Sequence, residues 1–178
     1  MAITAGTDIL ASDFINTSAG AGDSGKAPKL NSSGKLDKSF PSRFGVKAIQ
    51  TGTQGFSDGL VLQFAGESWD DDTMHDNVTN NTRITFKTAG TWLVGVSITG
   101  TGGSSNSANM VIRLNGTTVI AGGAVTDTIT TSKVGGTATL MRAFIVNDYI
   151  EVLVYGTNSP TTSGDEGTHI WAQIIQTT

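Results

Sequence analysis

Carboxylates and a histidine gather in one stretch of the chain, Asp70-Asp71-Asp72 followed by His75 and Asp76. Carboxylate oxygens are the ligands that hard cations such as calcium prefer. The run nevertheless lacks the Asp-x-Asp-x-Asp-Gly spacing that makes a calcium loop specific. Because unspaced acidic runs are usually solvated, we favour a solvated acidic loop over an ion site, and we predict neither a metal nor any other cofactor.

The other residues that could do chemistry fall into no catalytic pattern. His75 and His169 are the only histidines, and neither belongs to a His-Glu-x-x-His motif. The chain has no cysteine, and none of its serines lies in Gly-x-Ser-x-Gly. The glycine pairs at 102–103, 122–123 and 135–136 do not join a strand to a helix as a phosphate loop would. We therefore predict that the protein is not an enzyme.

Arg142 is a charged residue between Leu140 and Phe144 on one face of a predicted strand. Either this arginine is partly buried and paired, or the strand faces solvent at that point. Glu151, diagonally across the predicted Asn147-Asp148 turn, is a possible partner. We favour a structural ion pair over a ligand-binding role.

Short strands are the elements that would position these residues, because apolar and polar side chains alternate along most of the chain. In the most regular stretch, Trp92, Val94, Val96 and Ile98 share one face, which we predict to lie in a core. Asn115-Gly116 is a strong hairpin signal. The candidate strands cover residues 44–50, 60–64, 83–87, 91–99, 108–114, 117–121, 125–130, 137–146, 149–155 and 169–176. About ten short strands without long helices predict an all-β sandwich.

The stretch from Phe86 to Val94 resembles the F-x-x-P-x-x-G-x-Y-x-F core of the complement and tumour necrosis factor type of jelly roll. Asn147-Asp148, before the alternating apolar residues of 150–154, resembles the Gly-Asp that precedes a strand in that family. Gly95 and Gln173 depart from the family pattern. The resemblance implies a jelly-roll β-sandwich of antiparallel strands over residues 44–178, and heads of this family form compact trimers.

The last predicted strand carries apolar residues on both faces. Trp171 and Ile175 point one way, whereas Ile170, Ala172 and Ile174 point the other. A sandwich strand needs only one buried face, so something else must cover the second. A loop of the same chain is one possible cover, and a neighbouring subunit is the other.

The family resemblance implies that a threefold interface covers this second face. We therefore expect Leu93, Ile170 and Ile174 at a trimer interface. A register slip of one residue would place Trp171 there in exchange for Ile170.

Residues 1–43 are predicted to form an extended amino-terminal arm that serves as attachment segment and linker. Thr7 or Asp8 could cap a short helix that carries Ile9, Leu10 and Phe14. Glycine and proline recur among polar residues over 19–43. The run Gly25 to Phe40 resembles a G-K-x-P-x-L-x-x-x-G-K-L-D-x-S-F stretch of bacteriophage tail-fibre, head-fibre and appendage proteins. The expected attachment residues are Ile9, Leu10, Phe14, Lys26, Lys29, Leu30, Lys35, Leu36 and Phe40. A mobile linker with exposed leucines is the alternative.

The net charge of −4 is unevenly distributed along the chain. Residues 1–55 carry a net charge of +2 and residues 56–178 a net charge of −6. An acidic head argues against nucleic-acid binding, whereas the basic segment from Lys26 to Lys47 could complement an acidic shell surface. The sequence shows no signal-peptide pattern and no apolar run approaching the roughly 20 residues of a membrane span, so we expect synthesis in the host cytoplasm and no membrane insertion.

Two functions are compatible with these observations. The first is a homotrimeric head-fibre or capsid decoration protein at the virion surface, attached by its arm to phage capsid or tail proteins. The alternative is the receptor-binding knob of a tail fibre, with the loops 100–107 and 158–168 recognising a host glycan or surface protein.

Overall fold

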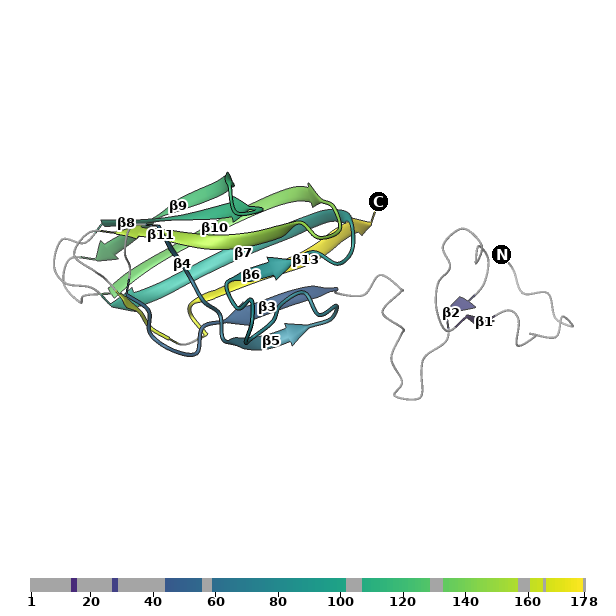
Figure 1. Cartoon of the computed structure of the whole chain (residues 1–178), viewed down its shortest axis with the longest axis horizontal. Helices are drawn as coiled ribbons and strands as arrows, with labels where there is room; N and C mark the ends of the chain where they lie inside the picture. Colours follow the sequence, from purple (N-terminus) through teal and green to yellow (C-terminus); the bar gives the residue numbers. More distant parts are fainter. Residues whose placement is uncertain are drawn as a thin grey trace, which may run out of the picture. The chain divides into compact units, whose positions relative to one another are not determined.

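The computed structural model describes residues 14–15, 27–28, 44–55, 59–101, 107–128, 133–156, 161–164 and 166–177. The chain forms two units, Met1–Phe44 and Gly45–Thr178 (Figure 1). In the first unit, β1 (Phe14–Ile15) and β2 (Ala27–Pro28) pair in parallel. Phe14, expected in a short helix, therefore lies in a strand, while Ile9 and Leu10 of that expected helix lie outside the described residues.

The second unit is built entirely from strands in the part of the chain that the structure describes, as the sequence predicts. Its elements are β3 (Gly45–Ile49), β4 (Leu60–Val61), β5 (Gly66–Asp70), β6 (Arg83–Thr85), β7 (Gly90–Thr101), β8 (Ser107–Leu114), β9 (Thr118–Thr128), β10 (Lys133–Phe144), β11 (Tyr149–Gly156), β12 (Thr161–Thr162) and β13 (His169–Thr177). No described segment is a helix long and apolar enough to cross a membrane.

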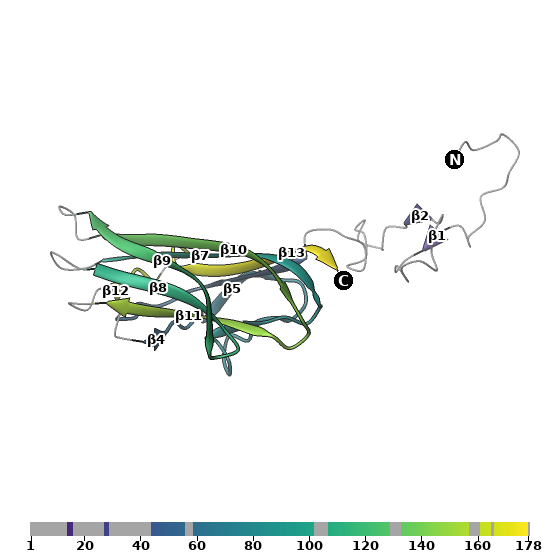
Figure 2. The same ribbon diagram turned by 90° about the horizontal axis from the view of Figure 1, so that it is seen from above.

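The strands pair antiparallel in the order β4-β11-β8-β9-β10-β7-β13-β3-β5, with β6 beside β11 and β12 beside β7. Figure 1 shows β7 between β10 and β13, and Figure 2 shows β8 between β9 and β11. Register pairing between β9 and β10 covers only Thr126–Thr128 with Lys133–Gly135. The strands therefore form two layers, one containing β6, β11, β8 and β9, and the other containing β10, β7, β13, β3 and β5.

The core lies between these layers and is centred on three aromatic side chains. Phe86 stacks on Phe144 with ring centroids 3.9 Å apart and meets Trp92 edge-on at 5.1 Å. Trp92 is fully buried, and its indole Nε1 donates a hydrogen bond of 3.3 Å to the Thr88 carbonyl. Val94, Val96 and Ile98 are also buried. The predicted inward face of this strand is therefore confirmed.

Two linked turns close one end of the unit. Asn115 and Gly116 have φ of 49° and 73°, which fits the hairpin predicted from this dipeptide. The Asn115 amide donates to the Asp148 carboxylate at 2.8 Å, and its carbonyl oxygen accepts from the Tyr149 backbone N–H at 2.9 Å. Asp148 also accepts from the Ile145 N–H at 3.0 Å. These bonds tie the β8–β9 turn to the β10–β11 turn.

The observed strands differ from the prediction mainly around glycines and polar segments. The strands predicted at 117–121 and 125–130 form the single strand β9. At Gly123 an added Cβ would lie 2.8 Å from the Thr137 carbonyl oxygen, so this glycine allows a close approach between backbones rather than a break. β5 was not predicted, because Gly66-Glu67-Ser68-Trp69-Asp70 shows little apolar alternation.

Replacing Trp92 by alanine should lower the free energy of unfolding by about 3 to 5 kcal/mol, because it leaves a cavity beside Phe86 in the core. This is a large share of the roughly 5 to 15 kcal/mol of an ordinary domain. Urea unfolding followed by circular dichroism measures the change, and Val119→Ala, at a residue that is 58% exposed, is the control. A Trp92→Ala protein as stable as its parent would contradict this packing.

Candidate functional site

The outer face of the β10-β7-β13-β3-β5 layer carries large apolar side chains. Because Trp92 and Val94 point inward, Leu93 and Gly95 point outward. Residues directly opposite one another on paired strands share a face, and Leu93 pairs with Met141 of β10. Gly95 pairs with Trp171 of β13, so these outward positions form a continuous surface across the layer.

This surface extends over β3 and β5. Trp171 pairs with Lys47, which pairs in turn with Trp69. Met141 is 67% exposed and Trp69 is 39% exposed, whereas Leu93 and Trp171 are half-buried. We call the group Trp69, Leu93, Met141 and Trp171 the outer apolar face.

Two glycines lie beneath the indole rings of this face. A Cβ added at Gly95 would lie 2.4 Å from the Trp171 ring, and one added at Gly45 would lie 3.0 Å from the Trp69 ring. Each indole therefore rests against the backbone of a neighbouring strand. At Gly95 the Trp171 ring itself excludes a Cβ, whereas at Gly45 the Ala172 carbonyl oxygen excludes it. Gly95, where the sequence departs from the family pattern, is explained by this contact.

The predicted interface residues are divided between the two faces of the layer. Ile170 is fully buried and pairs with Val96, and Ile174 pairs with Trp92, so both belong to the inward side of β13. The prediction that Ile170 and Ile174 point away from the core is therefore wrong. The alternative register is correct, because Trp171 lies on the outer face with Leu93. Apolar residues on both sides of β13 made the two registers indistinguishable from the sequence.

The acidic run folds a loop rather than standing free in solvent. The Asp70 carboxylate accepts backbone N–H bonds from Asp72, Met74 and His75 at 3.2, 3.0 and 2.9 Å. Asp71 accepts from the Gly45 N–H at 3.2 Å. The prediction of a solvated acidic loop is therefore only partly correct. The carboxylates of Asp70 and Asp71 accept hydrogen bonds from backbone N–H groups that have no backbone acceptor in this irregular segment. Among the described residues, no three His, Asp or Glu side chains are grouped to hold a metal ion.

Each histidine has a local partner. The His75 side chain is completely buried, and its Nδ1 lies 3.0 Å from Glu67 Oε1. His169 Nδ1 lies 2.7 Å from the Glu166 carbonyl oxygen.

Asp76 accepts hydrogen bonds from the backbone N–H groups of Val78 and Thr79, both 2.9 Å long. The N–H of Thr79, and then that of Val78, hold the pKa of Asp76 below its ordinary value of 3.8.

Arg142 does not pair with Glu151. Glu151 instead accepts two bonds from Arg113, at 2.8 Å from Nη2 and 3.2 Å from Nε. Arg113 is directly opposite Glu151 across β8 and β11, whereas Arg142 belongs to β10 in the other layer and is exposed. The predicted pair is therefore wrong. β10 and β11 follow one another in the chain, but they do not pair with each other, and β11 pairs with β8 instead.

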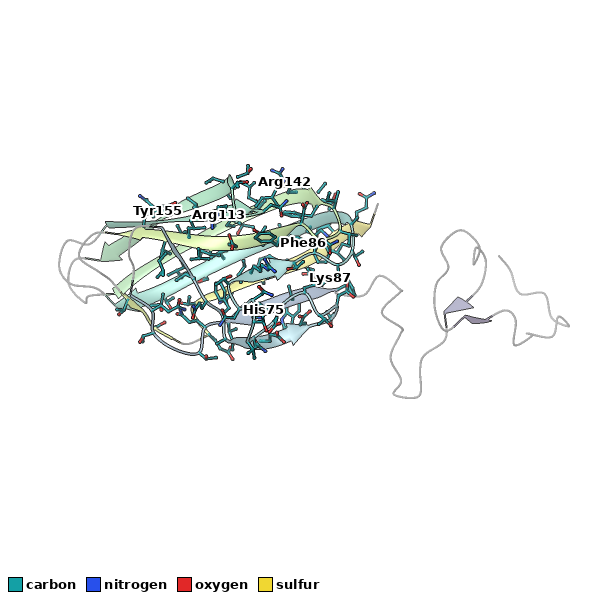
Figure 3. All side chains as sticks on the ribbon, in the orientation of Figure 1. His75, Phe86, Lys87, Arg113, Arg142 and Tyr155 are labelled. Carbon is teal, nitrogen blue, oxygen red and sulfur yellow. The ribbon has the colours of Figure 1, made fainter. Side chains whose placement is uncertain are left out.

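An open hollow of about 850 Å³ lies beside β6, and the sequence did not predict it. Its walls come from β5, the segment after it, β6, the β10–β11 turn and the start of β11, and they include Glu67, Arg83 and Tyr149. Figure 3 labels His75 and Lys87, two further residues of its lining. These residues are far apart in the sequence and carry no motif, so only the fold brings them together.

Several predicted residues cannot be placed. The attachment residues Ile9, Leu10, Lys26, Lys29, Leu30, Lys35, Leu36 and Phe40 lie outside the described residues. The predicted receptor-binding loops 100–107 and 158–168 are described only in part.

No family model matches this chain, and no curated protein matches it. Solved structures match it in fold. The globular domain of zebrafish complement 1qA protein has a TM-score of 0.57 at 6% identity, covering 75% of this chain and 98% of that one. Eiger TNF from S. frugiperda has a TM-score of 0.60 at 12% identity, with coverages of 76% and 94%. Murine APRIL has a TM-score of 0.59 at 9% identity, with coverages of 75% and 100%.

At these identities the likeness concerns the fold alone. The second unit is a jelly-roll sandwich similar to complement and tumour necrosis factor domains, which confirms the fold predicted from the sequence. None of the three similar structures is named as an enzyme.

The hydrogen bonds to Asp76 should make its loop sensitive to acid. Because its folded pKa is lowered, the stabilisation is present above the ordinary value of 3.8 and is lost as pH falls through the lower folded value. The protection of the Val78 and Thr79 amides against hydrogen exchange, relative to an unfolded chain at the same pH, should therefore fall over that range. Carbon NMR of the carboxyl group measures the pKa, and Asp76→Asn should remove the pH dependence. An Asp76 pKa at or above 3.8 would contradict the bonding described.

Proposed function

We propose that the protein is a homotrimeric component of a bacteriophage particle, a head-fibre or capsid decoration protein whose head self-associates through the outer apolar face. The observation that carries this proposal is the exposure of Trp69 and Met141 beside Leu93 and Trp171 on one side of a single layer. Large apolar surfaces of this kind commonly mark protein–protein contacts.

The composition and flatness of the face fit a subunit contact. Trp and Met are enriched at interfaces, and fully buried apolar area contributes roughly 25 cal/mol per Å². Because Trp69 and Trp171 rest on glycines, they present broad ring surfaces that a partner can cover with little loss of side-chain freedom. The chain has no cysteine, so association would stabilise it without disulfides. We propose three subunits, and not another number, because the sequence resembles the complement and tumour necrosis factor type of jelly roll, whose heads form trimers.

Attachment to a virion is proposed for the amino-terminal segment. One support is that the run from Gly25 to Phe40 resembles a stretch of phage appendage proteins. The other is the basic character of the segment from Lys26 to Lys47, in which Asp37 is the only acidic residue. A basic segment can bind an acidic capsid surface. The proposed location is accordingly the surface of the virion.

Leu93→Asp should prevent trimer formation, because it would bury a charge without a partner at the subunit contact. Sedimentation equilibrium and light scattering should give a trimer for the parent and monomers or aggregates for the variant. Val119→Asp is the matched control, since Val119 is an exposed apolar residue on β9 in the other layer. A monomeric parent, or a trimeric Leu93→Asp protein, would overturn the proposed interface.

Deletion of residues 1–42 should separate attachment from assembly. The shortened protein keeps the whole second unit and should still sediment as a trimer, but it should no longer bind phage particles in a pull-down. The control is the full-length protein with Val119→Asp, which should bind particles normally. Normal binding by the shortened protein would show that the head makes the virion contact.

A further inference from the structure

The hollow beside β6 is a second surface, separate from the outer apolar face. β6 pairs with β11 in the layer that contains β8 and β9, whereas the outer apolar face belongs to the opposite layer. Its volume of about 850 Å³ is within the range of about 300 to 1,000 Å³ found for small-molecule sites.

Donors and acceptors are mixed in the wall of the hollow. Its charged members are two cations, Arg83 and Lys87, and two carboxylates, Glu67 and Asp76. The other polar lining residues are Thr73, His75, Asn77, Asn80, Thr85, Asn147 and Tyr149. The charges are balanced, which disfavours a phosphate, since that needs excess positive charge, and a divalent cation, since that needs excess carboxylate.

Several of these groups are held in place before any ligand arrives. The guanidinium of Arg83 lies 4.7 Å from the ring centroid of Tyr149. Glu67 is positioned by its contact with buried His75 at 3.0 Å. Asp76 orders the segment that bears Val78, whose side chain is 86% exposed at the hollow. Such preorganisation lowers the cost of binding.

Two atoms of the wall have unused hydrogen-bonding capacity. Arg83 Nε, a donor, and Asn77 Oδ1, an acceptor, are both buried and have no hydrogen-bond partner among the described residues. Buried polar groups are normally paired, so these two side chains are exceptions in the wall. Both atoms are shielded from solvent, so a ligand in the hollow reaches exposed lining groups such as Asn80 and Lys87 rather than these two atoms.

We propose that this hollow binds a neutral saccharide unit. A sugar ring presents several adjacent hydroxyls that both donate and accept, and it carries no net charge, so it matches a balanced wall of amides, carboxylates and cations. Its C–H groups offer an apolar surface that can contact Val78 at the rim. Arg83 and Asn80 then donate to ring hydroxyls, and Glu67 accepts from them.

Binding to printed neutral oligosaccharides, and saturation-transfer NMR with glucose, galactose, mannose and N-acetylglucosamine, test this proposal on the full-length protein. We expect millimolar binding of at least one of these sugars. Thr85→Trp, which fills the hollow, and Asn80→Ala, which removes an exposed amide, should each weaken it by about tenfold or more. Thr118→Trp, at an exposed threonine of β9, should bind like the parent.

Thermal unfolding establishes whether each variant is folded. If Thr85→Trp does not fold, Asn80→Ala decides alone, because the Asn80 side chain is exposed. Absence of neutral-sugar binding, binding of acidic sugars only, or binding that survives in every folded hollow variant would each overturn the proposal. A loss of sugar binding in a hollow variant that keeps the fold and oligomeric state of the parent would support it.

Discussion

The pairing of β7 with β10 and β13 determines on which face of their layer the large side chains of these three strands lie. β7 pairs with β10 along its whole length and with β13 from His169 to Thr177, so the alternation of β7 is imposed on both neighbours. With this register, Trp92 and Ile170 enter the core while Leu93 and Trp171 face outward. A shift of one residue would reverse all four positions, exposing the aromatic core to water.

The same register explains the flatness of the outer apolar face. It places Gly95 opposite Trp171 and Gly45 close to Trp69, so each indole lies against backbone instead of standing above the sheet. Aromatic rings arranged in this way lose little further freedom on binding. The face is therefore suited to a broad contact with another subunit, whereas the hollow, with its concave polar wall, is suited to a small ligand.

Short polar side chains hold several loops and turns of the head in place. Asp70 and Asp76 bond the N–H groups of the β5–β6 connection, while Asn115 and Asp148 join two turns at one end of the sandwich. Each side chain replaces a backbone partner that an irregular segment lacks. The connection after β5 is thereby held beside β6, where it forms one wall of the hollow.

The sequence by itself determined the all-β class, the inward face of the strand at Trp92, and the Asn115-Gly116 hairpin, because alternation and turn preference are local properties. It could not choose the register of β13, where Ile170 and Trp171 were equally good core candidates, since that choice depends on which face the neighbouring strand buries. Nor could it pair Glu151 with Arg113 or assemble the hollow from Glu67, Arg83 and Tyr149. Those contacts join residues distant in sequence, and only the packing of the strands decides them.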